Sequence, residues 1–131
     1  MADAMQVEVV SPERKVASME ANAVMLPGLD GDFTAMAGHV PVATALRPGL
    51  VRVQVDGRNE DFLITGGFAE VSNAGVSVLA EHVATRDEAT KDMFAGSLKA
   101  AEETLENADA DSTAEAKRAL DGLKSLVDGL N

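Results

Sequence analysis

The chain has 131 residues, no cysteine, and 22 acidic against 11 basic side chains, giving a net charge of −11 with histidine neutral. This length allows one domain with a real core, or one small domain with an appendage. The lack of cysteine excludes disulfides and thiolate metal sites, and the negative charge argues against nucleic acid or anionic lipid as a direct partner.

No apolar run reaches the length of a membrane span. The N-terminal stretch MADAMQVEVV has no basic region followed by an apolar block, so we expect no signal or transit peptide and a protein that faces the cytosol.

The chain from Met5 to about Val83 shows the period-two alternation of strands with one buried face. The apolar positions that define this pattern include Met5, Val7, Val9, Val51, Val53, Val55, Phe62 and Ile64. Asp56-Gly57, Gly66-Gly67 and Asn73-Ala74-Gly75 interrupt it and predict turns. An antiparallel β-sandwich or flattened barrel follows from this pattern.

Residues 26–50, LPGLDGDFTAMAGHVPVATALRPGL, are unusually rich in turn-forming residues for a β-region. They hold three of the four prolines, the neighbouring acids Asp30 and Asp32, and His39, one of two histidines. Such a composition favours a shaped loop surface over a simple connection.

After Val83 the period becomes helical. Apolar residues recur every three or four positions in two stripes: Phe94, Leu98, Ala101, Leu105 and Ala108, then Ala116, Leu120, Leu123, Val127 and Leu130. Thr85 with Glu88, and Ser112 with Glu115, form sequence patterns of capping boxes that would start the two helices.

The predicted fold is therefore α+β, with a β-sandwich over residues 1–84 and an antiparallel two-helix hairpin over residues 85–131. The stripes are thin, and Gly96, Gly122 and Gly129 lower helix stability by about 1 kcal/mol each if they lie inside a helix. A hairpin that detaches from the sandwich and one that stays docked are both compatible with this composition.

The sequence contains no complete motif of an enzyme active site. A Ser or Thr nucleophile would need His39 or His82 as base, and no G-x-S-x-G frame is present. Asp30 and Asp32 begin a calcium-loop pattern, but its twelfth position is Pro41. No phosphate-binding glycine motif occurs. We predict no catalytic residue, metal or cofactor; the alternative is a small ligand-binding domain or hydrolase that uses Asp30, Asp32 and His39.

Several blocks resemble the epsilon subunit of bacterial F-type ATP synthases, in order and spacing over the first 85 or so residues. These blocks are residues 9–14 (VVSPER), 26–28 (LPG), 31–33 (GDF), 38–41 (GHVP), 46–53 (LRPGLVRV), 66–71 (GGFAEV) and 76–81 (VSVLAE). The helical remainder matches the family in length and layout.

The resemblance implies a non-catalytic rotor subunit of the central stalk on the cytoplasmic face of the bacterial inner membrane. Such a subunit grips the gamma subunit, rests on the loops of the c-ring, and couples proton-driven rotation to ATP synthesis. It is a peripheral subunit of an ion-transporting complex. In many members the C-terminal hairpin inhibits ATP hydrolysis by reaching the alpha and beta subunits of the catalytic head.

Carried onto this sequence, the resemblance implies that Gly31, Asp32 and Phe33 contact the c-ring. It implies that Gly38, His39 and Pro41 contact gamma, with His39 as a hydrogen-bonding interface residue. Thr34 and Ala37 depart from the family pattern, which has glycine and proline near these positions.

The C-terminal half departs further. Some members bind ATP through an Asp and an Arg at the start of the first helix, but residues 89–94 read ATKDMF and place neither. We predict no ATP sensing by this route. Inhibition by the second helix would depend on Lys117, Arg118 and Lys124, so regulation of hydrolysis stays open.

Overall fold

The alternating apolar residues of the first half form a β-sandwich, which we describe from a computed structural model covering residues 4–130. Its ten strands are β1 (Met5–Val10), β2 (Lys15–Ala21), β3 (Ala23–Gly28), β4 (Gly31–Met36), β5 (Val42–Leu46), β6 (Gly49–Val55), β7 (Arg58–Ile64), β8 (Gly67–Ser72), β9 (Gly75–Ala80) and β10 (Val83–Thr85). The chain divides into two compact units, Met1–Asp87 and Glu88–Asn131, and each is described by itself.

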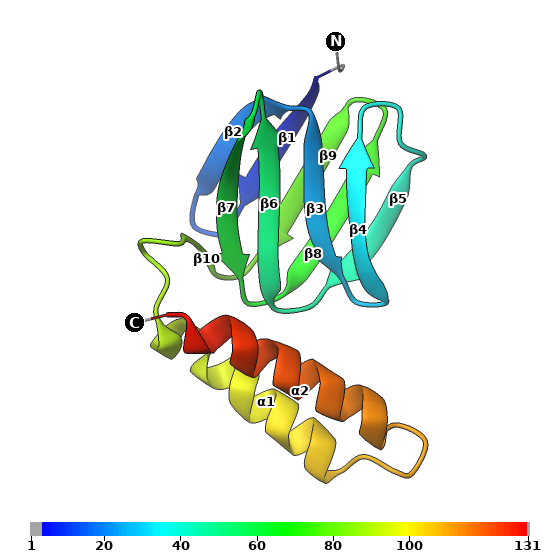
Figure 1. Ribbon diagram of the computed structural model, residues 1–131. Helices are drawn as coiled ribbons and strands as arrows, with labels where there is room; N and C mark the ends of the chain where they lie inside the picture. Colours follow the sequence, from blue (N-terminus) through cyan, green and yellow to red (C-terminus); the bar gives the residue numbers. More distant parts are fainter. Residues whose placement is uncertain (1–3, 131) are drawn as a thin grey trace. The chain divides into compact units, whose positions relative to one another are not determined.

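The strands pair along one path, β10-β7-β6-β3-β5-β8-β9-β1-β2, with β4 branching from β3. Among the described strands only the β1–β9 pair is parallel. The path folds into two layers, with β7, β6, β3 and β4 facing β1, β9, β8 and β5 (Figure 1). It crosses from one layer to the other where Gly28 pairs with Leu46, the single register pair between β3 and β5.

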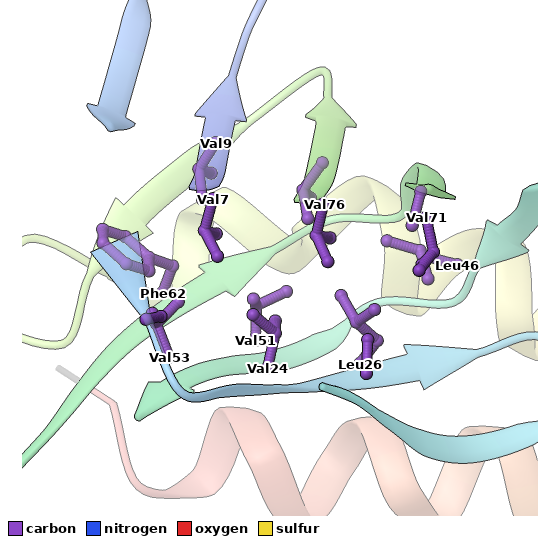
Figure 2. Close-up of a cluster of buried hydrophobic side chains, with 14 of the residues drawn as sticks. Val7, Val9, Val24, Leu26, Leu46, Val51, Val53, Phe62, Val71 and Val76 are labelled. Atoms are coloured by element: carbon purple, nitrogen blue, oxygen red, sulfur yellow. The ribbon is translucent and has the colours of Figure 1, made fainter. Parts of the chain in front are cut away.

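The core between the layers consists largely of valine. Figure 2 shows Val7 and Val76 pointing toward Val51 of the opposite layer. Six described valines have no exposed surface: Val7, Val9, Val24, Val51, Val53 and Val78. Burial of each such side chain contributes about 1.5–3 kcal/mol, and β-branched residues suit a pleated surface. The predicted sandwich and its buried face are confirmed.

Two predicted turns form as tight hairpins. Asp56 (φ 42°) and Gly57 (φ 84°) both have positive φ between β6 and β7, the conformation of a type I′ turn, which matches the twist of the strands. Asn73 and Ala74 connect β8 to β9, and Gly75 follows with φ 153°. A Cβ on Gly75 would collide with the carbonyl of Gln6 on β1, so this position needs glycine.

Residues 26–50 are not the elaborate loop that their composition predicts. Most of them lie in β3, β4, β5 and β6, joined by short connections at residues 29–30, 37–41 and 47–48. Prolines and glycines lie at or beside the ends of these strands, where the N–H that proline lacks is not needed for the ladder of hydrogen bonds. The prediction of an extended loop surface was therefore wrong, because it counted turn-forming residues without regard to their position on short strands.

The second unit contains the 3₁₀ turn η1 (Lys91–Phe94) and helices α1 (Ala95–Glu106) and α2 (Thr113–Asp128). In α2 the predicted stripe is buried at Ala116, Leu120, Leu123 and Val127, whereas α1 has no fully buried residue. No helix within residues 4–130 has the length and apolar character needed to cross a membrane.

Neither predicted capping box caps its helix. Thr85 is the last residue of β10, where it pairs with Phe62, and α1 instead begins after Phe94. Ser112 does occupy the N-cap of α2, but its side chain makes no cap bond; its hydroxyl donates to Asp109 Oδ1 at 3.0 Å. Thr85 thus belongs to a strand and lies ten residues before the first residue of α1, and the Ser112 hydroxyl takes part in a local turn with Asp109.

Candidate protein-docking site

A tight turn joins β3 to β4 and projects an apolar side chain. Gly28 and Gly31 face each other in register, and Leu29 between them is 61% exposed. A Cβ on Gly28 would lie 2.5 Å from the Gly31 carbonyl oxygen and 3.1 Å from the Phe33 ring. Glycine therefore allows the closely packed turn that we call the β3–β4 tip, residues 28–33.

Arg47, between β5 and β6, binds the β3–β4 tip from the side. Its backbone N–H donates to the Pro27 carbonyl at 2.9 Å, and the Leu29 N–H donates to the Ala45 carbonyl at 2.9 Å. One guanidinium nitrogen donates to the Gly28 carbonyl, and another forms an ion pair with Asp32. The LPG and LRPGL blocks of the sequence are thus brought together in space.

The three residues predicted to contact the c-ring lie at the start of β4. Gly31 and Asp32 are exposed, with 69% of the Asp32 side chain accessible. Phe33 is half-buried and packs against the sandwich core. The predicted site thus combines one accessible carboxylate with backbone and apolar surface.

The three residues predicted to contact gamma lie in the loop after β4, which spans residues 37–41. Gly38 has φ 84°, and the His39 N–H donates to the Met36 carbonyl at 3.0 Å. The Phe33 and His39 ring centroids are 6.4 Å apart. The predicted c-ring site and the predicted gamma site lie at the two ends of β4, which spans roughly 17 Å at the usual rise of a strand. The contact between the two rings connects these sites.

His39 is half-buried, and its Nδ1 lies 2.7 Å from the Val40 carbonyl oxygen. A carbonyl can only accept, so Nδ1 carries the proton and Nε2 is left for another partner. Val40 itself is 72% exposed. This loop therefore offers one imidazole nitrogen beside an apolar side chain, a combination suited to protein contact.

The positions of Thr34 and Ala37 explain how the chain accommodates both departures from the family pattern. Thr34 is exposed on β4 opposite Met25, where a β-branched residue suits a strand. Ala37 is half-buried and packs against the core.

The alternative catalytic set of Asp30, Asp32 and His39 is not arranged for proton transfer. Asp32 is paired with Arg47, and His39 Nδ1 is bonded to a carbonyl. Residues 4–130 contain no group of three or more His, Cys, Asp or Glu side chains that could hold a metal ion. His82 is exposed, and its Nδ1 lies 3.5 Å from the Thr65 hydroxyl at the end of the sandwich.

A second charged cluster links β6 and β7 to the segment after β10. Asp61 accepts hydrogen bonds from Arg52 Nε and Arg86 Nε, each at 2.8 Å, and only 12% of its side chain is exposed. The hydrogen bond from Arg52, with that from Arg86 and both positive charges, lowers the pKa of Asp61 to about 2. The sequence alone predicts neither this cluster nor the contacts of Arg47, since both depend on residues that are distant in the chain.

A row of apolar side chains crosses the outer face of the layer formed by β5, β8, β9 and β1. Ala45, Phe68, Leu79 and Val10 follow one another in register on β5, β8, β9 and β1. Phe68 is 46% and Leu79 52% exposed. Apolar side chains gathered in this way on a sheet face are typical of surfaces that contact other proteins.

The fold and these surfaces define a β-sandwich protein with exposed apolar side chains of the kind found where proteins contact one another. The family model for the β-sandwich domain of the ATP synthase Delta/Epsilon chain matches residues 4–86. The ATP synthase epsilon chain of Rhodobacter capsulatus is 43% identical over 131 residues, covering 100% of this chain and 99% of the relative. That of Paracoccus denitrificans is 43% identical over 129 residues, covering 98% and 87%.

Two solved structures share the fold. A chain of the Euglena gracilis mitochondrial ATP synthase matches with TM-score 0.68 and 21% identity, covering 98% of this chain and 82% of that one. A chain from the central stalk and c-ring of the Tetrahymena thermophila mitochondrial ATP synthase matches with TM-score 0.62 and 17% identity, covering 98% and 96%. The chain belongs to the ATP synthase epsilon chain family.

Proposed function

We propose that this chain is a rotor subunit of the central stalk of a bacterial F-type ATP synthase, at the cytoplasmic face of the inner membrane. It couples proton-driven rotation of the c-ring, through gamma, to ATP synthesis and performs no bond chemistry itself. The observation that carries this proposal is the similarity to the epsilon chain of Rhodobacter capsulatus along 100% of the chain, through both units.

The β3–β4 tip is the surface that meets the c-ring. Gly31, Asp32 and Phe33 lie there beside the exposed Leu29. Asp32 would pair with a basic residue of a polar ring loop. Because the carboxylate is exposed, one such pair contributes only about 0–1 kcal/mol, so its main effect is to set the register of docking. Burial of Leu29 supplies the larger favourable contribution.

The loop of residues 37–41 is the surface that meets gamma. Gly38, His39 and Pro41 present backbone groups and the His39 Nε2, and Val40 supplies apolar area. The Phe33–His39 contact gives the two surfaces a common support. A load applied at the tip is thereby transmitted to the loop through packed side chains rather than through a flexible connection.

Single cysteines provide a test, because the natural sequence has none. Leu29→Cys, Val40→Cys and Arg58→Cys would each be labelled with a photoactivated crosslinker and assembled into the complex. We expect adducts with the c-ring from Leu29→Cys and with gamma from Val40→Cys. Arg58, exposed at the start of β7 opposite Val55, serves as control and should give neither.

Absence of both adducts in an assembled, active complex would rule out these contacts. Absence of the chain from the purified complex would rule out the rotor role itself.

A further inference from the structure

Asp32 does not present a bare carboxylate, because Arg47 already pairs with it. The same guanidinium donates to the Gly28 carbonyl on the other strand of the tip. Arg47 therefore bridges both strands of the tip, and it does so from residue 47, where the path of the sheet crosses between the layers. No other basic side chain within residues 4–130 makes a described contact with the tip.

We propose that Arg47 is the positioning residue of the c-ring docking surface: it fixes the tip in one conformation and holds Asp32 so that the carboxylate stays accessible to a cation on the partner. This inference rests on the proposed docking role of the tip. A two-residue turn has little apolar packing of its own, and a planar guanidinium that bonds two groups at once restricts it more than a single point contact would.

The pair also limits which partners fit. The 69% exposure of the Asp32 side chain leaves room for a second cation, but Arg47 already supplies one positive charge beside it. A partner loop with a single basic residue and apolar neighbours matches this surface and Leu29. A strongly cationic segment does not, because Arg47 would repel it.

The test uses the full chain and ATP synthase from which this subunit has been stripped. Arg47→Met removes both guanidinium contacts, and Arg47→Lys keeps the charge but not the planar fork. Arg58→Met removes an exposed arginine at the start of β7 and is the matched control. Amide hydrogen exchange is measured at Leu29, which bonds to Ala45, and at Asp56, which bonds to Asn22.

In Arg47→Met we expect exchange at Leu29 to accelerate about tenfold, with little change at Asp56, and binding to the stripped complex to weaken about five- to tenfold. Arg47→Lys should fall between, and Arg58→Met should match the wild type. In the double variant Asp32→Asn, Arg47→Met the binding losses should overlap rather than add, since both act through one pair.

Three outcomes would overturn the proposal. Faster exchange at Leu29 with unchanged binding would show that docking does not need a fixed tip. Weaker binding with unchanged exchange would make Arg47 a direct partner contact. Tighter binding with a steeper salt dependence would make it a competitor for Asp32. Failure of the wild-type chain to bind would instead refute the proposed function.

Discussion

The two units of the chain gain their stability in different ways. The sandwich core is a continuous cluster of buried side chains, all contributed by residues 5–83. In the helical unit α2 buries four side chains, η1 buries Phe94 and α1 buries none, and Gly96 and Gly122 lie inside the helices. From this difference we expect the sandwich to be stable by itself and the hairpin to be close to the limit of independent stability.

The largest expected difference between the units is in the cost of replacing a leucine by alanine in each of them. Leu26→Ala removes a side chain that is 1% exposed between the layers and should lower the free energy of unfolding by about 2–5 kcal/mol. Leu105→Ala removes a half-buried side chain of α1, so less burial is lost and the cost should be about 1 kcal/mol or less. Urea unfolding, followed by NMR signals from each unit, measures both, and equal losses would contradict the comparison.

A smaller effect is expected at Asp61, which ties Arg86 to the sandwich. Its pKa is lowered from 3.8 to about 2 in the folded chain. The pair therefore stabilises the fold above pH 4, and this contribution is lost as the pH falls from about 4 to about 2. Because the arginines are partly exposed, we expect a loss on the order of 1 kcal/mol.

Asp61→Asn should abolish this part of the pH dependence of unfolding, measured by circular dichroism. Asp121→Asn, in the exposed pair with Lys117 on α2, is the control and should leave the pH profile unchanged. A profile that Asp61→Asn does not flatten would remove the cluster as a pH-dependent stabilising contact.

The helical unit should accept alanine in place of glycine. A Cβ on Gly122 meets nothing within 4 Å, so Gly122→Ala should stabilise α2 by up to about 1 kcal/mol. Gly75→Ala in the sandwich should be strongly destabilising, because its Cβ meets the Gln6 carbonyl. Helicity on mild heating measures the first change and the midpoint of sandwich unfolding the second. Equal responses would show that both units are packed alike.

The sequence predicts well whatever depends on periodicity. Val7, Val9, Val51 and Val53 are buried because their strands have one inward face, and the same reasoning locates the stripe of α2. Prediction from the sequence fails where a residue is engaged by another that is distant in the chain. Thr85 pairs with Phe62 rather than capping a helix, and this pairing depends on strand register that a single sequence does not contain.

The candidate site divides in the same way. The resemblance supplies the residues of the tip and the loop, but the contacts that organise the tip join residues 15 and 19 apart in sequence, Arg47 with Asp32 and with Gly28. The composition of residues 26–50 predicts a loop, because a single sequence does not distinguish a proline or glycine at the end of a strand from one inside a loop.

The smallest effect is expected from removing the hairpin altogether. A chain ending at Asp87 keeps β10 and the Asp61–Arg86 pair, whereas one ending at Val83 loses both. Since the core cluster lies wholly within the sandwich, the first truncation should unfold at nearly the same urea concentration as the sandwich of the full chain. It should also still assemble and support ATP synthesis. Loss of the truncated chain from the complex would show that the hairpin is needed for docking, and a rise in ATP hydrolysis would show that it inhibits the enzyme.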